Sequence, residues 1–268
     1  MIEKRFLEVL KSAFLLREGV DLNAKNKFNG FSRQAFAFLA ELRDNNNKEW
    51  FEANRETYQN ELVIPLRNLV SDLSEFIISM DYNLDVTPAI GKTISRIYKD
   101  ARRLRGGPPY KKSMWVAFKR PLEEWKESPT FYIEIMADSY SYGMGFYSAP
   151  RDMMELFREN IVKRPAEFSN AVKFYKKEKE LGLYGDYYKK LKCPEGLSDD
   201  VFEWYRKKSF YLSSENPLDG LITTPKFTGI VTAAFARLAP LYHYLWKLKL
   251  KARAESEKHA LKSFYEKR

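Results

Sequence analysis

The sequence predicts an α+β fold, in which an antiparallel β-sheet is packed with helices that precede and follow it in sequence. Between about residues 93 and 147, short runs of β-branched and aromatic residues alternate with polar ones, as in half-buried strands. No helical segment of crossover length separates these runs, so neighbouring strands should pair antiparallel. On both sides of this block, apolar residues recur at helical spacing. Helices around a block of strands are typical of the α+β class.

The first helices are predicted from apolar spacing and from capping residues. Residues 2–17 carry an apolar residue at every fourth position, and Gly19 is a stop signal. A polar linker follows at residues 23–29, and Ser32 should cap a helix whose apolar stripe is Phe36, Leu39 and Leu42. We therefore expect residues 1–30 to form an N-terminal helix and linker, and residues 31–268 to form a single domain.

The run NNNKEWF, residues 45–51, is typical of a joint between two helices. Asn46 stands three residues before Glu49, the spacing of a capping box, so Asn46 or Asn47 should cap a helix that begins near Lys48. That helix is expected to reach Met80, with a kink at Pro65 because proline lacks an amide donor. The alternative is that the asparagine amides line a pocket.

The strands and the later helices follow from the same periodicities. Four runs are strand-like: residues 93–98, 113–120, 130–138 and 141–148. The clearest alternation sets Phe131, Ile133 and Ile135 against Tyr132 and Glu134. Later segments predict helices over residues 152–161, from Pro165 to about Glu180, over residues 199–207, and from Pro225 or Thr228 to the C-terminus, with a strand-like run at residues 208–213.

Composition excludes several classes of site. The chain has one cysteine, Cys193, and two histidines, His243 and His259, so an internal disulfide is excluded and the usual zinc clusters and catalytic triads have almost no candidate residues. Phosphate-loop, HExxH and dinucleotide-binding motifs are absent. No run has the length of a membrane span, and the N-terminus lacks a secretory signal. We expect a cytoplasmic protein with no membrane, metal or cofactor.

Positive charge is concentrated in one stretch. Between Lys92 and Arg120 there are ten Lys or Arg residues and one acid, a net charge of +9, whereas the whole chain carries +10. Such a stretch indicates a site for something anionic, because an arginine fork grips a carboxylate or phosphate with two hydrogen bonds and a lysine adds a point charge. The candidate ligand-binding residues here are Arg96, Lys99, Arg102 and Lys111.

One acid and one phenol in this stretch are candidates for catalysis. Asp100 would either hold the arginines in place or act on a bound substrate as an ionised carboxylate, with Tyr110 as a hydrogen-bond donor. The simpler interpretation is a solvated basic hairpin. Against it stand the apolar residues that should anchor the stretch to a core, namely Ile94, Ile97, Tyr98 and Leu104.

A known sequence pattern covers most of the chain. Arg96, Lys99, Asp100 and Arg102, followed by Tyr110 and Lys111, are in register with a motif that reads Arg-x-x-Arg-Asp-x-Arg-Phe and ends in Tyr. Further matches are NNNKEWF, GFYSAP before a helix that carries Arg158, RKKSF at residues 206–210, and FARLAPL in the last helix. From Phe31 to Leu248 the chain resembles the mostly bacterial family catalogued as domain of unknown function 2461. The resemblance implies a shared fold and a shared site, with Arg158 near the basic residues, and no particular reaction.

The chain departs from the family pattern at four positions. Arg103 stands where the family has Phe, and Lys99 replaces an arginine. Gly106 and Gly107 replace an acid or amide followed by lysine. If that pair contributes to the family's chemistry, this chain has lost part of it or has changed ligand.

Three functions remain open at this point. The first is binding of a phosphorylated or carboxylated small molecule in a cleft of Arg and Lys. The second is nucleic-acid binding through the basic hairpin and the C-terminal helix, where residues 247–268 carry eight basic and three acidic side chains. The third is a non-catalytic interaction domain with a structural ion-pair network. A concave cluster of charge would favour the first function, and a convex stripe the second.

Overall fold

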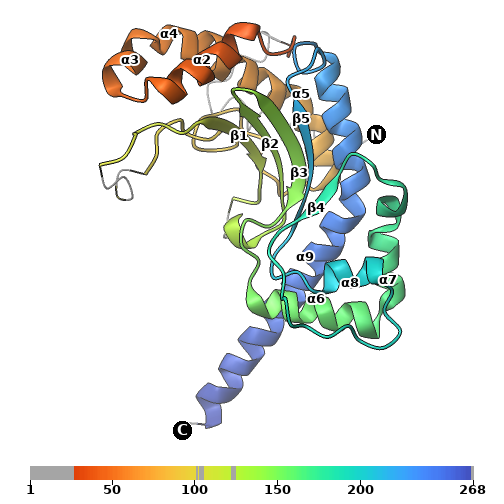
Figure 1. Cartoon of the computed structure of the whole chain (residues 1–268). Coiled ribbons are helices and arrows are strands. Elements are labelled where there is room, and N and C mark those ends of the chain that lie inside the picture. The colour runs from red at the N-terminus through yellow and green to blue at the C-terminus, as the bar shows by residue number, and fades with distance from the viewer. Residues whose placement is uncertain (1–26, 101, 103–105, 122–124, 267–268) are drawn as a thin grey trace, which may run out of the picture.

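The computed structural model describes residues 27–100, 102, 106–121 and 125–266 (Figure 1). The helix expected over residues 2–17 and the anchor residue Leu104 lie outside this part of the chain. Within it, helices come before and after a central sheet, as expected for an α+β protein.

The sheet is antiparallel and has the strand order β1-β2-β3-β5-β4. Its members are β1 (Ser113–Phe118), β2 (Thr130–Met136), β3 (Ser139–Gly145), β4 (Gly182–Tyr184) and β5 (Tyr211–Pro217). The predicted antiparallel architecture is therefore confirmed. The first strand-like run, residues 93–98, forms only isolated bridges, of Ile94 with Val116 and of Tyr98 with Tyr110. β4 was not predicted, because three residues are too few to show a period.

The helices fall into an N-terminal and a C-terminal group. The first group is α2 (Arg33–Asp44), α3 (Lys48–Ala53), α4 (Arg55–Thr57) and α5 (Ile64–Met80). The second is α6 (Arg151–Lys163), α7 (Pro165–Ala171), α8 (Asp199–Tyr205) and α9 (Lys226–Glu266). Ser32 caps α2 by accepting a hydrogen bond from the Ala35 amide at 3.2 Å, as its sequence predicts. α7 is shorter than predicted and is followed by a 3-10 turn over Lys173–Lys177.

The prediction of one continuous helix from Lys48 to Met80 was wrong. The chain breaks at Asn54 and then makes a wide π-helical segment, Tyr58–Val63, before α5 begins. In this segment the Ile64 amide donates to the carbonyl of Gln59, five residues earlier. Pro65 follows in the first turn of α5, where it has no amide to donate. Where the sequence predicted a kink at this proline, the structure has a change from π-helical to α-helical pitch just before it.

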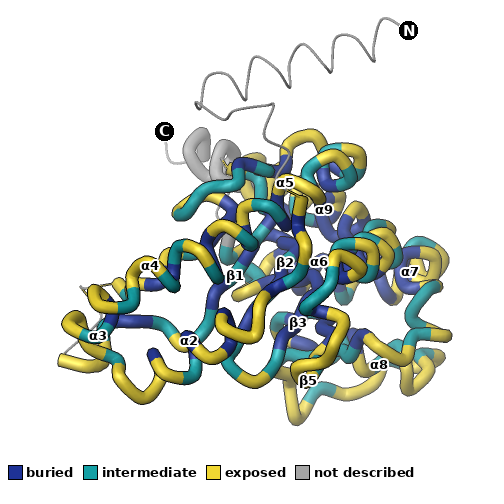
Figure 2. The backbone as a smooth tube through the Cα atoms, turned by 90° about the horizontal axis from the view of Figure 1, so that it is seen from above, coloured by how far each residue is buried: buried dark blue, intermediate teal, exposed yellow. Residues whose placement is uncertain are grey.

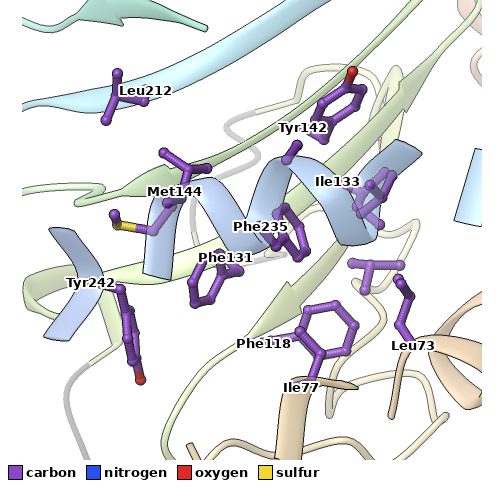
Figure 3. Close-up of a cluster of buried hydrophobic side chains, with 14 of the residues drawn as sticks. Leu73, Ile77, Phe118, Phe131, Ile133, Tyr142, Met144, Leu212, Phe235 and Tyr242 are labelled. Atoms are coloured by element: carbon purple, nitrogen blue, oxygen red, sulfur yellow. The ribbon is translucent and has the colours of Figure 1, made fainter. Parts of the chain in front are cut away.

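The hydrophobic core lies on one face of the sheet. Figure 1 shows α5 and α9 along this face, and Figure 2 shows buried residues gathered where the strands meet these helices. In Figure 3, Phe235 and Tyr242 of α9 lie against Phe131 of β2, with ring centroids 4.9 Å and 4.8 Å from it. The other core-face residues of the strands are Met114, Val116, Phe118, Ile133, Ile135, Tyr142, Met144 and Leu212.

A buried ion pair joins three elements behind the sheet. Asp81, at the end of α5, accepts hydrogen bonds from the Tyr242 hydroxyl at 2.6 Å and from Arg120 at 2.8–2.9 Å. The Arg120 guanidinium also lies 3.8 Å from the ring centroid of Trp246. Burial opposes ionisation of Asp81, but the hydrogen bonds from Tyr242, the Asn83 amide and Arg120 outweigh it and lower the pKa of the carboxyl. The pair therefore links α5, the end of β1 and α9.

The opposite face of the sheet is open. Strand residues alternate between faces, so the neighbours of the core residues point away from α5 and α9. No helix in the described part of the chain covers this second face (Figure 1). None of the described helices is long and apolar enough to cross a bilayer.

Candidate functional site

The three asparagines of NNNKEWF have three separate structural roles. Asn45 donates its side-chain amide to the Glu41 carbonyl at the end of α2, and Asn47 caps α3 by accepting from the Trp50 amide at 2.9 Å. Asn46 instead contacts a distant segment: its side-chain oxygen accepts from the Tyr110 amide at 2.9 Å, and its nitrogen donates to the Tyr110 carbonyl at 3.2 Å. The predicted cap is therefore confirmed at Asn47, whereas the capping box from Asn46 to Glu49 was wrong.

We call residues 96–112 the basic arm; Asn46 holds it at Tyr110. The Tyr110 ring stacks on Phe51 of α3, with centroids 4.4 Å apart, and lies 5.1 Å from Tyr98. The side chain is only 1% exposed, and burial raises the pKa of its phenol. Tyr110 thus anchors the arm with a ring that is buried against Phe51.

Asp100 and Arg102 form a pair at the surface of the arm. The Arg102 guanidinium donates two hydrogen bonds to the Asp100 carboxylate, at 2.8 Å and 3.0 Å. The Arg102 side chain is 88% exposed and that of Asp100 is 38% exposed. The pair matches the role of Asp100 as an orienting partner, but it lies in solvent rather than in a desolvated cradle.

Arg96 and Lys111 form a second group in the arm. The Lys111 ammonium donates to the Arg96 carbonyl at 2.8 Å, and burial together with the Arg96 charge lowers the pKa of Lys111. Lys99 is half-buried, and its backbone amide donates to the Pro109 carbonyl at 2.8 Å. The structure brings Asp100 to Arg102 and Arg96 to Lys111. Residues 101 and 103–105 of the arm lie outside the described residues.

Arg158 lies at the other end of the sheet from the arm. The arm leads into β1 at Ser113, whereas α6, which carries Arg158, follows the end of β3 at Gly145, and antiparallel pairing places these two points at opposite ends of the sheet. The Arg158 guanidinium donates to the Lys207 carbonyl at 3.2 Å and lies 5.4 Å from the Tyr188 ring centroid. The structure does not bring Arg158 to the other candidate residues.

A cavity of about 610 Å³ opens on the uncovered face of the sheet. We call it the hollow. It is lined by side chains of β1, β2, β3 and β5 together with Phe146 and Tyr147. Sequence reasoning did not find this site. The strand residues that line it are Trp115, Ala117, Thr130, Tyr132, Glu134, Met136, Ser139, Tyr140, Ser141, Gly145, Tyr211, Ser213, Glu215, Asn216 and Pro217.

Small residues of β3 form the floor of the hollow. Along the open face this central strand presents Ser141, Gly143 and Gly145, which carry little or no side chain. The strands beside it carry large rings, because Tyr132 of β2 pairs with Gly143 and Tyr211 of β5 pairs with Gly145. Ser141 and Gly145 line the hollow, whereas Gly143 between them is buried beside the Tyr132 and Tyr211 rings, whose centroids lie 6.4 Å apart.

Hydroxyl groups fix the rings of the hollow in position. The Trp115 indole N–H donates to the Ser113 hydroxyl at 3.2 Å, and Ser113 is in turn hydrogen-bonded to the Glu134 carboxylate. Tyr132 is hydrogen-bonded to Ser213. The three rings follow one another across the sheet, with centroids 5.4 Å apart for Trp115 and Tyr132 and 6.4 Å apart for Tyr132 and Tyr211.

The charges of the hollow are negative. Glu134 and Glu215 pair with Ser141 from its two sides, so the two carboxylates flank the central strand in one row. Burial raises the pKa of Glu134, and the bond from Ser113 offsets this only in part. Burial, with the nearby carboxylates, also raises the pKa of Tyr132 and of Tyr211, so both phenols stay neutral hydrogen-bonding groups.

The sequence contains a signal for this face. The alternation that predicts β2 already sets Tyr132 and Glu134 on the side away from the core, and Gly143 and Gly145 recur at the same period in β3. Aromatic and acidic residues beside a strand with glycine at every second position indicate an open, hollowed sheet face. What the sequence does not give is the strand order, which brings β5 with Tyr211 and Glu215 next to β3.

A comparison with models of known protein families shows which family the chain belongs to. The model of the family described as conserved hypothetical protein (DUF2461) matches residues 34–244, which include the arm and all five strands of the sheet. The chain belongs to this family. No curated protein matches the sequence.

Proposed function

We propose that the protein binds a small organic molecule in the hollow on the open face of its sheet. The volume of about 610 Å³ supports this, since ligand sites in proteins are commonly about 300–1,000 Å³. The lining has the usual composition of such a site: several rings and a few fixed polar groups. The hollow lies within the residues that define the family.

The observation that carries the proposal is the position of the rings. Trp115, Tyr132 and Tyr211 are large aromatic side chains that would ordinarily be covered, yet they stand half-buried on a face that no described helix covers. Burying such rings against a ligand is favourable at roughly 25 cal/mol for each Å² of apolar surface removed from water. The uncovered rings therefore offer binding energy to a flat or apolar ligand.

A thermal-shift panel with a blocked variant tests this proposal. A panel of metabolites of mixed charge is screened against the wild type and against Ala117→Phe, which places a ring into the hollow from a half-buried position on the open face. A ligand bound by the native form raises the melting temperature. We expect hits that are lost in Ala117→Phe and kept in Arg102→Ala, the control on the arm. Hits that survive in Ala117→Phe would place the ligand elsewhere.

A second candidate function is contact with phosphate groups at the basic arm, either of nucleic acid or of an anionic small molecule. The observation that favours it is the group formed by Arg96 and Lys111: the Lys111 ammonium donates to the Arg96 carbonyl, and burial together with the Arg96 charge lowers the pKa of Lys111, so a bound anion would stabilise the charged ammonium. Tyr98, 44% exposed on the same arm, could stack on a base.

Binding of a fluorescent single-stranded oligonucleotide, measured by anisotropy, tests the second candidate. Affinity should fall steeply between about 50 mM and about 200 mM salt if phosphates are contacted. Arg96→Ala should weaken it, whereas Arg151→Ala, an exposed arginine at the other end of the sheet, should not. Competition by inorganic pyrophosphate would indicate a small anion. Equal affinity of both variants and the wild type would exclude the arm as the contact.

A further inference from the structure

We infer that the ligand of the hollow is an organic cation, an ammonium or amidinium group carried by a flat or apolar skeleton. This inference rests on the proposed function and narrows it. Three observations support it independently: the charge of the lining, the identity of its rings, and the placement of its two carboxylates.

The charge of the hollow is opposite to that of the protein. The chain has 46 Lys and Arg residues against 36 Asp and Glu, a net charge of +10. Among the described residues, those that line the hollow nevertheless include Glu134 and Glu215 and no Lys, Arg or His. Neither glutamate forms an ion pair within the described residues, although most of the acidic side chains of α6 do. Glu134 is half-buried, and a half-buried carboxylate without a cation is costly, whereas Glu215 is exposed at the edge of the hollow; an incoming cation would supply the missing charge.

The rings suit a cation as well. The faces of Trp and Tyr rings carry partial negative charge, and they attract ammonium and guanidinium groups that lie within about 6 Å of the ring centroid. Trp115, Tyr132 and Tyr211 form a continuous series across the open face of the sheet. The protein already uses this contact in its own packing, where Arg120 lies 3.8 Å from the Trp246 centroid.

The carboxylates are placed to act on one ligand. Glu134 on β2 and Glu215 on β5 are each one strand away from Ser141, so their backbones are separated by two strand spacings, roughly 10 Å. Tyr211 lies in the same strand as Glu215 and its ring is 6.4 Å from that of Tyr132, the strand neighbour of Glu134, so the rings and the carboxylates line one hollow. A cationic group over Ser141 would lie between the carboxylates, with the skeleton of the ligand against the Tyr132 and Tyr211 rings.

Other ligand classes fit less well. An anion would face two like charges with no lining cation to offset them. A metal ion would find only two carboxylates, since no group of three or more His, Cys, Asp or Glu side chains is assembled in the described part of the chain. A purely apolar ligand would leave both lining carboxylates without a countercharge from the described residues.

Three soluble probes that differ only in terminal charge test the inference. Tyramine, 4-ethylphenol and 4-hydroxyphenylacetate share a phenol ring and a two-carbon chain, and they end in a cation, a neutral methyl and an anion. We expect isothermal titration calorimetry of the full chain to rank tyramine first and 4-hydroxyphenylacetate last. A hydrogen-bonded charge pair of this kind corresponds to about a tenfold difference in affinity.

Isosteric variants show whether the carboxylates cause the preference. Glu134→Gln and Glu215→Gln keep the size of each side chain and remove its charge. Each should weaken tyramine about tenfold and leave 4-ethylphenol unchanged. Glu159→Gln on α6, a surface carboxylate outside the hollow, is the matched control and should change neither affinity. Circular dichroism confirms that all variants are folded.

The outcomes separate the inference from the function on which it rests. Equal affinity for tyramine and 4-ethylphenol, with both lost in Ala117→Phe, would overturn the cation and keep the hollow as the binding site. A tyramine affinity that is unchanged in both glutamine variants would overturn the cation equally. Failure of all three probes to bind at millimolar concentration would also overturn it, while the metabolite panel still decides whether the hollow binds anything.

Discussion

The basic arm and the hollow both meet at β1, but they differ in charge, in shape and in what holds their side chains. The arm gathers cations in sequence, and its described arginines reach solvent. The hollow gathers two carboxylates and three rings from several strands of the sheet, and serine hydroxyls hold Trp115, Tyr132 and Glu134. The cations that are close together in sequence therefore lie at the surface, whereas the cavity is formed by residues that the strand order of the sheet brings together.

The largest expected difference in stability is between variants of two aspartate–arginine pairs, one behind the sheet and one on the arm. The Asp81 side chain is 5% exposed behind the sheet, so Asp81→Ala would leave Arg120 without its carboxylate and should cost about 3 kcal/mol of unfolding free energy. Asp100→Ala removes an exposed pair on the arm and should leave the denaturation midpoint almost unchanged. Chemical denaturation measures both, and a larger loss for Asp100 would show that the arm is structural.

The same pair predicts a pH dependence. Because folding lowers the pKa of Asp81, its contribution to stability is present above the ordinary aspartate pKa of about 4 and is lost as the pH falls through the lowered value. Asp81→Asn should therefore flatten the acid side of the stability profile. If the free energy of unfolding of this variant still falls with decreasing pH as it does in the wild type, then other groups cause the loss of stability in acid.

Two glycines give the next contrast. A methyl group on Gly143, in the strand that forms the floor of the hollow, would lie 1.8 Å from the Leu212 carbonyl oxygen, so Gly143→Ala should cost more than about 2 kcal/mol by forcing β3 from β5. A methyl group on Gly106 in the arm would have no described atom outside its chain neighbours within 4 Å. The cost of Gly106→Ala should therefore come from its positive φ of 79°, which disfavours alanine by about 1 kcal/mol. Thermal unfolding compares them. Equal losses would mean that the floor yields as readily as the arm.

Substitutions at Asn46 and Asn47 test whether the arm can loosen while the sheet stays intact. Asn47→Ala removes the cap of α3 and should cost about 1 kcal/mol. Asn46→Ala keeps that cap and removes both hydrogen bonds to Tyr110, so hydrogen exchange should quicken in the arm and stay unchanged in β2 and β3. Faster exchange in the strands as well would show that the arm and the hollow are one cooperative unit.

The smallest expected effect is the pH dependence of the hollow itself. Burial raises the pKa of Glu134, so the folded protein takes up this proton at a higher pH than the unfolded chain and the free energy of unfolding should rise slightly as the pH falls through the raised value. Tyramine affinity should fall over the same range, because binding needs the ionised carboxylate. Calorimetry between about pH 7.5 and about pH 5 measures this, and Glu134→Gln should show no such decline.

The sequence was sufficient where the signal is local. Periodicity and capping residues predicted α2, the cap of α3, the antiparallel strands β1 to β3 and the strand-like start of β5, since each depends on neighbours within a few residues. The break before Pro65 was missed because the choice between a kink and a π-helical turn depends on how the helix packs. β4 is too short to show a pattern.

The site was harder to predict for a physical reason. Asp100, Arg102 and Tyr110 were chosen because their charges and motif are contiguous, but burial decides what each does, and burial is a property of the fold. Tyr110 became an anchor against Phe51, and Arg102 a solvated partner of Asp100. The hollow needs Glu134 and Glu215, more than seventy residues apart in the chain, on either side of Ser141.

Glycine amides provide the most direct test of where the ligand binds. Gly145 lines the hollow and Gly143 lies two residues earlier in the same strand, whereas Gly106 and Gly107 lie in the arm. The backbone signals of all four glycines fall in one region of an amide correlation spectrum of the isotope-labelled protein. On titration with tyramine, we expect Gly143 and Gly145 to shift in a saturable way while Gly106 and Gly107 stay in place. Saturable shifts confined to Gly106 and Gly107 would contradict the placement of the ligand site on the open face of the sheet.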